Sequence, residues 1–196
     1  HNGWNISLAN SFRKPNLYER YGDDWVRSNP YLRPEKGKGI EASYEGITAW
    51  YYKFQQGIDY NYMTSSYYNI GEYESKGVKY SKHIMSDKGA FHIHVAYMDS
   101  DRIRVPEYKT KLSWYGGSVY GFDYMISYVG QFEKGLEFDG RPIDDVSTFN
   151  LNLGYNLTPR YRVAFQIRDV FDRNFEILPD YSAGGREISL ALDLSL

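Results

Sequence analysis

Three histidines are the residues of this sequence best suited to binding a transition metal. His92 and His94 are two positions apart, and His83 lies in the segment before them. Three imidazoles can hold Zn²⁺. A wall lined by water needs the same polar residues, however, and no group that would orient the imidazoles is evident nearby. We therefore keep these histidines as candidate metal ligands, but we predict neither a bound metal nor a cofactor.

Acidic residues occur in three close pairs, and paired carboxylates can bind Ca²⁺. None of the pairs has the spacing of an EF-hand loop, so solvated turn residues are the simpler interpretation. The sequence also lacks a glycine-rich phosphate loop, a G-x-S-x-G motif and the spacing of a catalytic triad, and we predict that the chain is not an enzyme. The acidic pairs are Asp23 and Asp24, Asp99 and Asp101, and Asp144 and Asp145.

The composition points to an all-β protein. The 196 residues include 21 Tyr, 10 Phe, 4 Trp and 18 Gly, and aromatic side chains favour strands. We expect residues 1–196 to form a single domain. A formal charge of −2 gives no electrostatic reason to expect a nucleic-acid partner, and the absence of cysteine excludes disulfides and thiolate metal sites.

Apolar residues alternate with other residues in ten segments, which is the period of a β-strand. The alternation predicts ten strands and no helix. The segments run from Trp4 to Phe12, Ile40 to Tyr44, Trp50 to Tyr62, Val78 to Ile84, Phe91 to Tyr97, Tyr108 to Trp114, Tyr120 to Tyr128, Phe149 to Leu157, Tyr161 to Ile167 and Ile188 to Leu196.

The two faces of these segments differ in a way that favours a membrane barrel over a soluble sandwich. On one face aromatic residues flank aliphatic ones, as in the lipid-facing band of an outer-membrane barrel, and we place Trp50, Tyr52 and Phe54 on that face. The other face carries polar residues such as Asn150 and Gln166, which suit a lumen. A soluble barrel with ordinary cross-strand aromatic pairs is the alternative.

The connections alternate between short and long. Tight turns are predicted at "EGIT", "SDKG", "YGGS" and "NLTPR", and the intervening links are longer. Short turns at one end and long loops at the other are the layout of bacterial outer-membrane barrels. This pattern places His1 and Leu196 at the short-turn, periplasmic end.

Five stretches, in order along the chain, resemble motifs of the TonB-dependent outer-membrane receptor family. They are "NSFRKPNLYERYG", "NPYLRPEKGKGIE", "IGEYESKGVKY", "RDVFDRNFE" and "GGREISLALDLSL". The chain departs from the family pattern at Lys79, where the family usually has Glu, at Asp169 and Val170, and at Leu196, where the family has an aromatic residue.

The resemblance implies an antiparallel transmembrane β-barrel in the bacterial outer membrane. The family's barrel has 22 strands around an N-terminal plug, and this chain resembles the last ten, the C-terminal part, without the plug. The implied function is import of a scarce metal chelate, an iron-siderophore or a cobalamin-like complex. The implied partners are outer-membrane lipid, the chelate, TonB acting through the plug of the complete receptor, and the barrel-assembly machinery.

In that family the chelate binds to the outer loops and the plug, which makes aromatic residues and arginines in the long links candidate ligand-binding residues. For any one of them, packing of loop against loop is the simpler interpretation. The candidates are Tyr18, Arg20, Tyr21, Trp25, Arg27, Phe132, Phe138, Arg141 and Tyr181.

Two other functions remain open from the sequence. A free-standing ten-stranded barrel acting as a pore or scaffold has the even strand number that closure requires. An outer-membrane barrel enzyme is the third possibility, and it would need a serine, a histidine and a carboxylate brought together.

Overall fold

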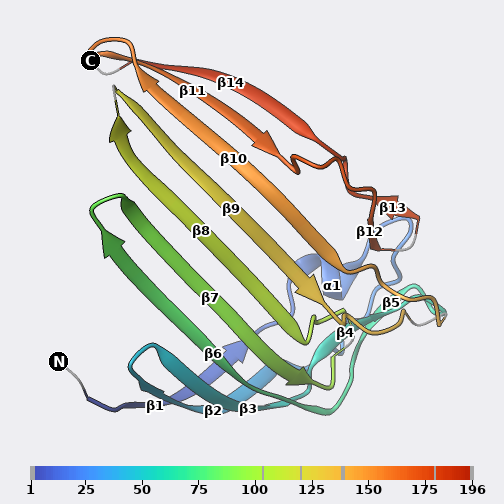
Figure 1. The fold of residues 1–196 in the computed structure, drawn as a ribbon. Coiled ribbons are helices and arrows are strands. Elements are labelled where there is room, and N and C mark those ends of the chain that lie inside the picture. The colour runs from blue at the N-terminus through green and yellow to red at the C-terminus, as the bar shows by residue number, and fades with distance from the viewer. Residues whose placement is uncertain (1–2, 103, 120, 138–139, 179, 195–196) are drawn as a thin grey trace. The chain divides into compact units, whose positions relative to one another are not determined.

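The computed structural model describes residues 3–102, 104–119, 121–137, 140–178 and 180–194. Ten antiparallel strands are hydrogen-bonded in the order β1-β2-β3-β6-β7-β8-β9-β10-β11-β14 (Figure 1). The chain divides into two compact units, residues 1–78 with 99–102 and residues 79–98 with 103–196. The division falls within β6 and β7, and the two units are described in turn.

The first unit contains three full strands of this sheet and the start of a fourth. A two-residue turn at Glu45 and Gly46, both with positive φ (45° and 87°), joins β2 to β3, as the "EGIT" motif predicts. The sheet strands are β1 (Asn5–Arg13), β2 (Glu35–Tyr44), β3 (Ile47–Gln55) and the first part of β6 (Glu72–Ser86).

The predicted orientation of β3 is wrong. Leu8 is opposite Ile40, and Ile40 is opposite Tyr51, so Tyr51 lies on the apolar face of this unit. Tyr52 is opposite Gly39, on the other face, and Trp50 and Phe54 share its side of the strand. The reason is steric: the Tyr52 ring covers the bare backbone of Gly39, as the Phe54 ring covers that of Gly37.

The link from β3 to β6 differs from the single long strand predicted through Tyr62. Gln56 has a positive φ of 56° and ends the extended run. A separate hairpin follows, made of β4 (Ile58–Asn61) and β5 (Ser66–Asn69). This hairpin belongs to the long connection, not to the ten-stranded sheet.

A short helix, α1 (Leu17–Tyr21), occupies the first long link, where no helix was predicted. Asn16 and Glu19 form a capping box, in which each side chain accepts a hydrogen bond from the other residue's backbone N–H (2.7 and 2.8 Å). The sequence signal was therefore present in "NLYE". No helix among the described residues is long and apolar enough to cross a membrane.

The second unit contains the rest of the sheet and a small outlying hairpin. Short turns alternate with long links, as predicted, except that "YGGS" lies within β8 and the tight turn follows it. The strands are the end of β6, β7 (Gly89–Ser100), β8 (Tyr108–Val119), β9 (Phe122–Phe132), β10 (Val146–Asn156), β11 (Tyr161–Arg168) and β14 (Glu187–Leu194), with β12 (Glu176–Leu178) and β13 (Tyr181–Ser182) in the hairpin.

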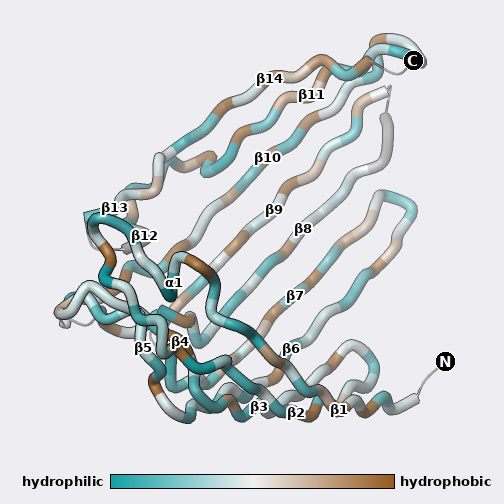
Figure 2. Tube along the Cα trace, turned by 180° about the vertical axis from the view of Figure 1, so that it is seen from behind, coloured by the Kyte–Doolittle hydropathy of each residue, from teal (hydrophilic) through white to brown (hydrophobic). Residues whose placement is uncertain are grey.

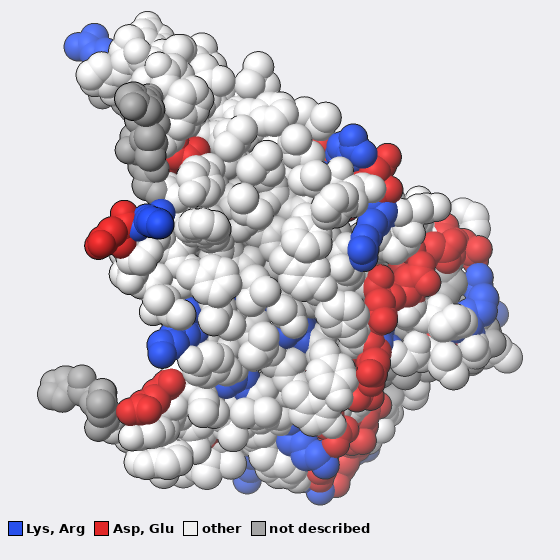
Figure 3. All heavy atoms as spheres, viewed as in Figure 1, with Lys and Arg blue, Asp and Glu red and all other residues white. Residues whose placement is uncertain are grey.

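Register places a row of apolar residues of the second unit on one face. A continuous row crosses five strands from β8 to β14, through Trp114, Ile126, Leu151, Ile167 and Ile188. Figure 2 shows the alternation of hydropathy along these strands, and Figure 3 shows a surface over β8 to β10 that is largely free of charged side chains. This apolar face is uncovered, since Trp114, Ile126 and Ile188 are 44%, 44% and 62% exposed.

The buried apolar side chains lie mainly in and beside the long connections, not between two layers of sheet. Val26 and Leu32 lie in the first long link, Ile58 begins β4 in the next one, and Ile143 lies in a loop of the second unit. A soluble sandwich would instead bury the inward row of every strand. The arrangement confirms the predicted antiparallel, barrel-type sheet and differs from that of a soluble sandwich.

The strands at the two ends of the order each have one hydrogen-bonded neighbour in the described part of the chain. β1 pairs with β2, and β14 pairs with β11. Every described residue of both strands is exposed. His1 and Leu196, whose position was predicted from the turn pattern, lie outside the described residues.

Candidate functional site

Charged side chains fix the first long loop to the end of β1. Arg13 Nη1 donates to Glu19 Oε1 (2.8 Å), and its Nε lies 3.9 Å from Glu35 Oε1 at the start of β2. Glu19 is 7% exposed and also caps α1. A buried carboxylate with these partners holds the loop to the sheet.

Residues 22–26 form a tight turn that displays Trp25. Asp23 Oδ1 accepts hydrogen bonds from the backbone N–H groups of Trp25 and Val26, both at 2.8 Å. These bonds, Trp25 first, hold the pKa of Asp23 below its ordinary value, with a smaller contribution from the Tyr18 hydroxyl. The Trp25 side chain is 85% exposed beside buried Val26.

Four tyrosines from the two loops of the first unit lie together. Tyr67 contacts Tyr18 and Tyr60 edge-on, with centroid distances of 6.1 and 5.1 Å, and Tyr60 contacts Tyr62 at 4.9 Å. Desolvation by the surrounding loops raises the pKa of Tyr18 and Tyr67 above the ordinary value. Sequence reasoning missed this tyrosine cluster because it assigned Tyr60 and Tyr62 to a membrane strand.

Hydrogen bonds to backbone carbonyl groups join the same two loops. Arg27 N donates to Ser65 O (2.7 Å), and Asn29 Nδ2 donates to Tyr67 O (2.8 Å). The hairpin and the first loop therefore form one surface. Of the predicted candidates, this surface exposes Tyr18, Tyr21, Trp25 and Arg27.

Arg20, by contrast, faces its own loop. Its Nη2 donates to Leu32 O (3.4 Å), and its Nε is buried with no hydrogen-bond partner among the described residues. This geometry gives Arg20 a packing role, which is the simpler of the two interpretations of the sequence.

The loops of the second unit hold two other candidates. Arg141 Nη1 pairs with Asp180 Oδ2 (2.8 Å) beside exposed Tyr181. A neighbouring hollow of about 540 Å³ is lined by polar and aromatic groups. Its lining residues are Arg141, Pro142, Asp144, Asn174, Phe175, Glu176 and Ser182.

Phe132 is not a loop residue, contrary to prediction. It is the last residue of β9 and lies opposite Tyr108, on the apolar face, where aromatic residues flank the aliphatic band. Phe138 lies outside the described residues.

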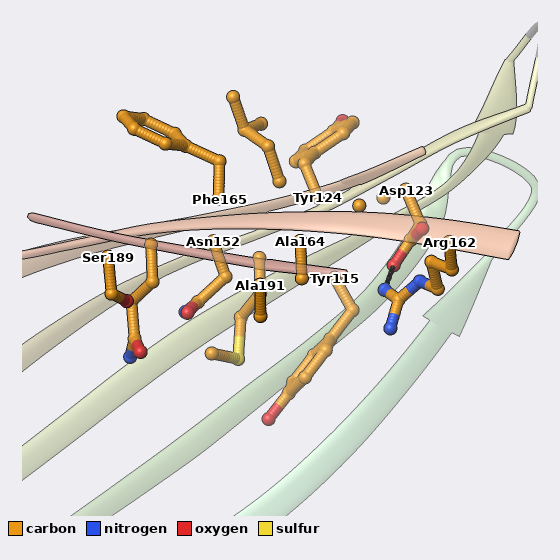
Figure 4. A pocket seen from close by; sticks show the side chains of 14 residues that line it. Tyr115, Asp123, Tyr124, Asn152, Arg162, Ala164, Phe165, Ser189 and Ala191 are labelled. Atoms are coloured by element: carbon orange, nitrogen blue, oxygen red, sulfur yellow. Dashed lines mark hydrogen bonds and ion pairs between the residues drawn. The ribbon is translucent and has the colours of Figure 1, made fainter. Parts of the chain in front are cut away.

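A second hollow, of about 380 Å³, lies along the sheet of the second unit (Figure 4). Asp123 and Arg162 form an ion pair (2.5 Å) on the same side as Asn152 and Ser189, whereas Phe165 points to the opposite side. The polar face of this unit is therefore a concave wall with a fixed ion pair and neutral hydrogen-bonding groups.

The three histidines share this polar face without forming a metal site. His83 and His92 contact edge-on at 4.8 Å, and His94 Nδ1 is bonded to Ser81 Oγ (2.8 Å). Within the described ranges no group of three or more His, Cys, Asp or Glu side chains is arranged to hold a metal ion.

The acidic pairs act within turns and between strands, in line with the simpler interpretation. Asp101 accepts a hydrogen bond from Glu74 N, and Asp99 pairs with Lys76. Asp144 and Asp145 likewise accept hydrogen bonds from the backbone N–H groups of Glu176 and Glu133, each at 2.8 Å.

Residues 2–170 match the family described as TonB dependent receptor-like, beta-barrel. Among solved structures, the chain is similar to the copper transporter OprC (TM-score 0.74, 12% identity), covering 98% of this chain and 37% of that one. The siderophore receptor PirA from Acinetobacter baumannii has a TM-score of 0.66 at 15% identity, covering 98% and 39%. The ferric enterobactin receptor PfeA from Pseudomonas aeruginosa, in complex with enterobactin, has a TM-score of 0.66 at 14% identity, covering 98% and 38%. This chain therefore spans about two fifths of the length of these structures.

Proposed function

Because the chain belongs to the TonB dependent receptor-like β-barrel family, we propose that it forms the C-terminal part of the barrel of a bacterial outer-membrane receptor that imports a scarce metal chelate. Import of this kind needs no covalent chemistry from the chain. The uncovered apolar face then contacts lipid, and the barrel-assembly machinery inserts the receptor. TonB acts through the plug of the complete receptor.

The ligand-binding part of this proposal rests on the loop surface of the first unit. It combines the tyrosine cluster with exposed Trp25 and Arg27, a set that offers aromatic contact area and a cation to an acidic chelate. Since one of the structures compared above is named as a siderophore receptor and another as a ferric enterobactin receptor, an iron-siderophore is the ligand we favour, with a cobalamin-like complex as the alternative.

The open edges support a partial barrel over a free-standing pore. A closed barrel pairs every strand on both sides. In the described residues β1 and β14 each pair on one side only. An enzymatic function has no comparable support.

The test is uptake by cells that carry the complete receptor and lack other iron receptors. We expect TonB-dependent uptake of radiolabelled ferric siderophore, and the double substitution Trp25→Ala and Arg27→Ala should weaken binding to whole cells about tenfold or more through lost aromatic and charge-assisted contacts. Leu157→Ala with Arg160→Ala, in the short turn between β10 and β11, is the matched control. Equal binding by both variants would refute the assignment of the loop surface.

A further inference from the structure

Three lysines lie on the apolar face of the first unit, at the end of the sheet where the long links begin. They are Lys36 and Lys38 of β2 and Lys53 of β3, and they are here termed the rim lysines. Lys38 is directly opposite Lys53, in the pair that follows Ile40 and Tyr51 on the same face. All three lysines are exposed, so the apolar surface of this unit ends in a cationic row.

Aromatic side chains accompany the rim lysines on this face. Tyr51 lies one pair before Lys38, and Phe12 of β1 is opposite Lys36. Aromatic rings and lysines are the side chains that suit the boundary between hydrocarbon and lipid headgroups, because each joins an apolar body to a polar or charged tip or lies beside one that does. The combination therefore places the rim lysines at headgroup depth.

The rim lysines carry more positive charge than the neighbouring carboxylate balances. Lys53 Nζ pairs with Glu72 Oε2 (2.7 Å), and Gln55 Nε2 donates to the other oxygen of Glu72 (3.1 Å). Lys36 and Lys38 form no ion pair with a carboxylate in the part of the chain that the structure describes. Like charges that face each other across two strands are destabilising, and an anion held between them would relieve the repulsion.

The apolar face of the second unit ends differently at the long links. There Tyr97 is opposite Tyr108, and Tyr108 is opposite Phe132, so aromatic rings from three neighbouring strands occupy the boundary. Such rings are the ordinary girdle of an outer-membrane barrel. The end of an apolar band therefore does not by itself require lysines, and the rim lysines mark a local feature of the first unit.

We propose that the rim lysines bind the phosphate groups of a phosphorylated lipid in the outer leaflet. This inference rests on the proposed function, which places the apolar face against lipid and the long loops outside the cell. Lys36 and Lys38 are two residues apart on one strand, about 7 Å, so both ammonium groups can form charge-assisted hydrogen bonds to one headgroup. The acyl chains of the same lipid would cover Leu8 and Ile40 on the adjoining surface, a contact that a free phosphate cannot make.

The experiment measures, by native mass spectrometry, the lipid that binds to the complete receptor in a neutral detergent. The probe is lipid A with both phosphates, and dephosphorylated lipid A is the matched ligand. Lys36→Gln with Lys38→Gln should weaken binding of the phosphorylated lipid about tenfold or more, because two ammonium groups are lost. Binding of the dephosphorylated lipid should be unchanged.

Two further variants serve as controls. Lys36→Arg with Lys38→Arg keeps both charges and should retain the phosphorylated lipid. Lys109→Gln with Lys111→Gln removes the same charge from the polar face of β8, since these residues alternate with Tyr108, and should not affect lipid binding. Far-UV circular dichroism checks that each variant is folded.

Equal binding of the phosphorylated lipid by the unsubstituted receptor and by the Lys36→Gln, Lys38→Gln variant would overturn the proposal, because the lysines would then only be solvated. Displacement of the lipid by excess inorganic phosphate would also overturn it, since the site would then bind anions without preference for lipid. The proposed function fails separately: a receptor that binds the phosphorylated lipid as expected but takes up no ferric siderophore would contradict import and not the lipid site.

Discussion

At the scale of single residues, Asp23 determines how Trp25 is presented. Gly22, which precedes Asp23, has a φ of 64°, and a Cβ added to Gly22 would overlap the Val26 carbonyl. The chain can therefore turn sharply only with glycine at this position, and the Asp23 carboxylate then satisfies two N–H groups. One ionised side chain thus orders the most exposed tryptophan of the loop surface.

We expect this turn to loosen in acid. The folded pKa of Asp23 lies below the ordinary value of about 3.9, so its contribution is present above that pH and is lost as the pH falls further, through the folded pKa. An NMR titration of the backbone amide of Trp25 should show a transition in that range. Asp23→Asn keeps an acceptor without the charge and should abolish the transition, whereas Asp24→Asn should preserve it.

The sequence identified the exposed residues of this loop but not their neighbours. Tyr18, Trp25 and Arg27 were candidates because they stand in a non-periodic stretch rich in aromatic residues and arginine. Tyr60 and Tyr67 come from a hairpin far along the chain, and no local pattern shows that it folds onto the first loop. The contact between the loops depends on long-range hydrogen bonds such as that from Asn29 to Tyr67.

At the scale of elements, glycines covered by aromatic rings determine which side chains of a strand lie on which face of the sheet. In the first unit the rings of Tyr52 and Phe54 cover Gly39 and Gly37 on the polar face. The Tyr52 hydroxyl also donates to Glu41 (2.6 Å). The alternation of residues predicted the strand, but it does not indicate which face of the strand contacts lipid. The rings of Tyr52 and Phe54 were therefore assigned to the lipid face, whereas they fill the space above glycines on the other face.

Gly39→Ala should therefore destabilise the sheet, by about 1–3 kcal/mol, because the new methyl group overlaps the Tyr52 ring. Urea unfolding of the receptor in detergent micelles would measure the change in the free energy of unfolding. Gly184→Ala has open space around it and should leave that free energy nearly unchanged. A neutral Gly39→Ala would contradict the close approach of the ring.

At the scale of the whole molecule, the two faces of the second unit require different surroundings. The row through Trp114, Ile126 and Leu151 is not covered by any segment that the structure describes, while the row of Met125, Asn152 and Gln166 on the other face lines a hollow. Composition and strand period were enough to predict this two-faced sheet. The short turn after β8 was misplaced because glycines at 116 and 117 resemble a hairpin signal, although they lie within the strand.

A positive charge should be tolerated on one face only. Ile126→Lys places an ammonium group on the apolar face and should cost about 2–4 kcal/mol near the middle of a bilayer. Gln166→Lys places the same group on the polar face and should cost little. Heat-modifiable migration on gels reports an intact barrel and would distinguish the two variants. Equal migration of the Ile126→Lys and Gln166→Lys receptors would contradict the assignment of the faces.

The free edges of β1 and β14 have a practical consequence for anyone who produces this chain by itself. Each edge offers a row of backbone donors and acceptors along exposed residues, beside the apolar face of the sheet. In water without detergent, such a polypeptide becomes a template for its own copies, and stacking into cross-β fibrils competes with folding. The isolated chain should therefore be refolded into detergent micelles at low protein concentration.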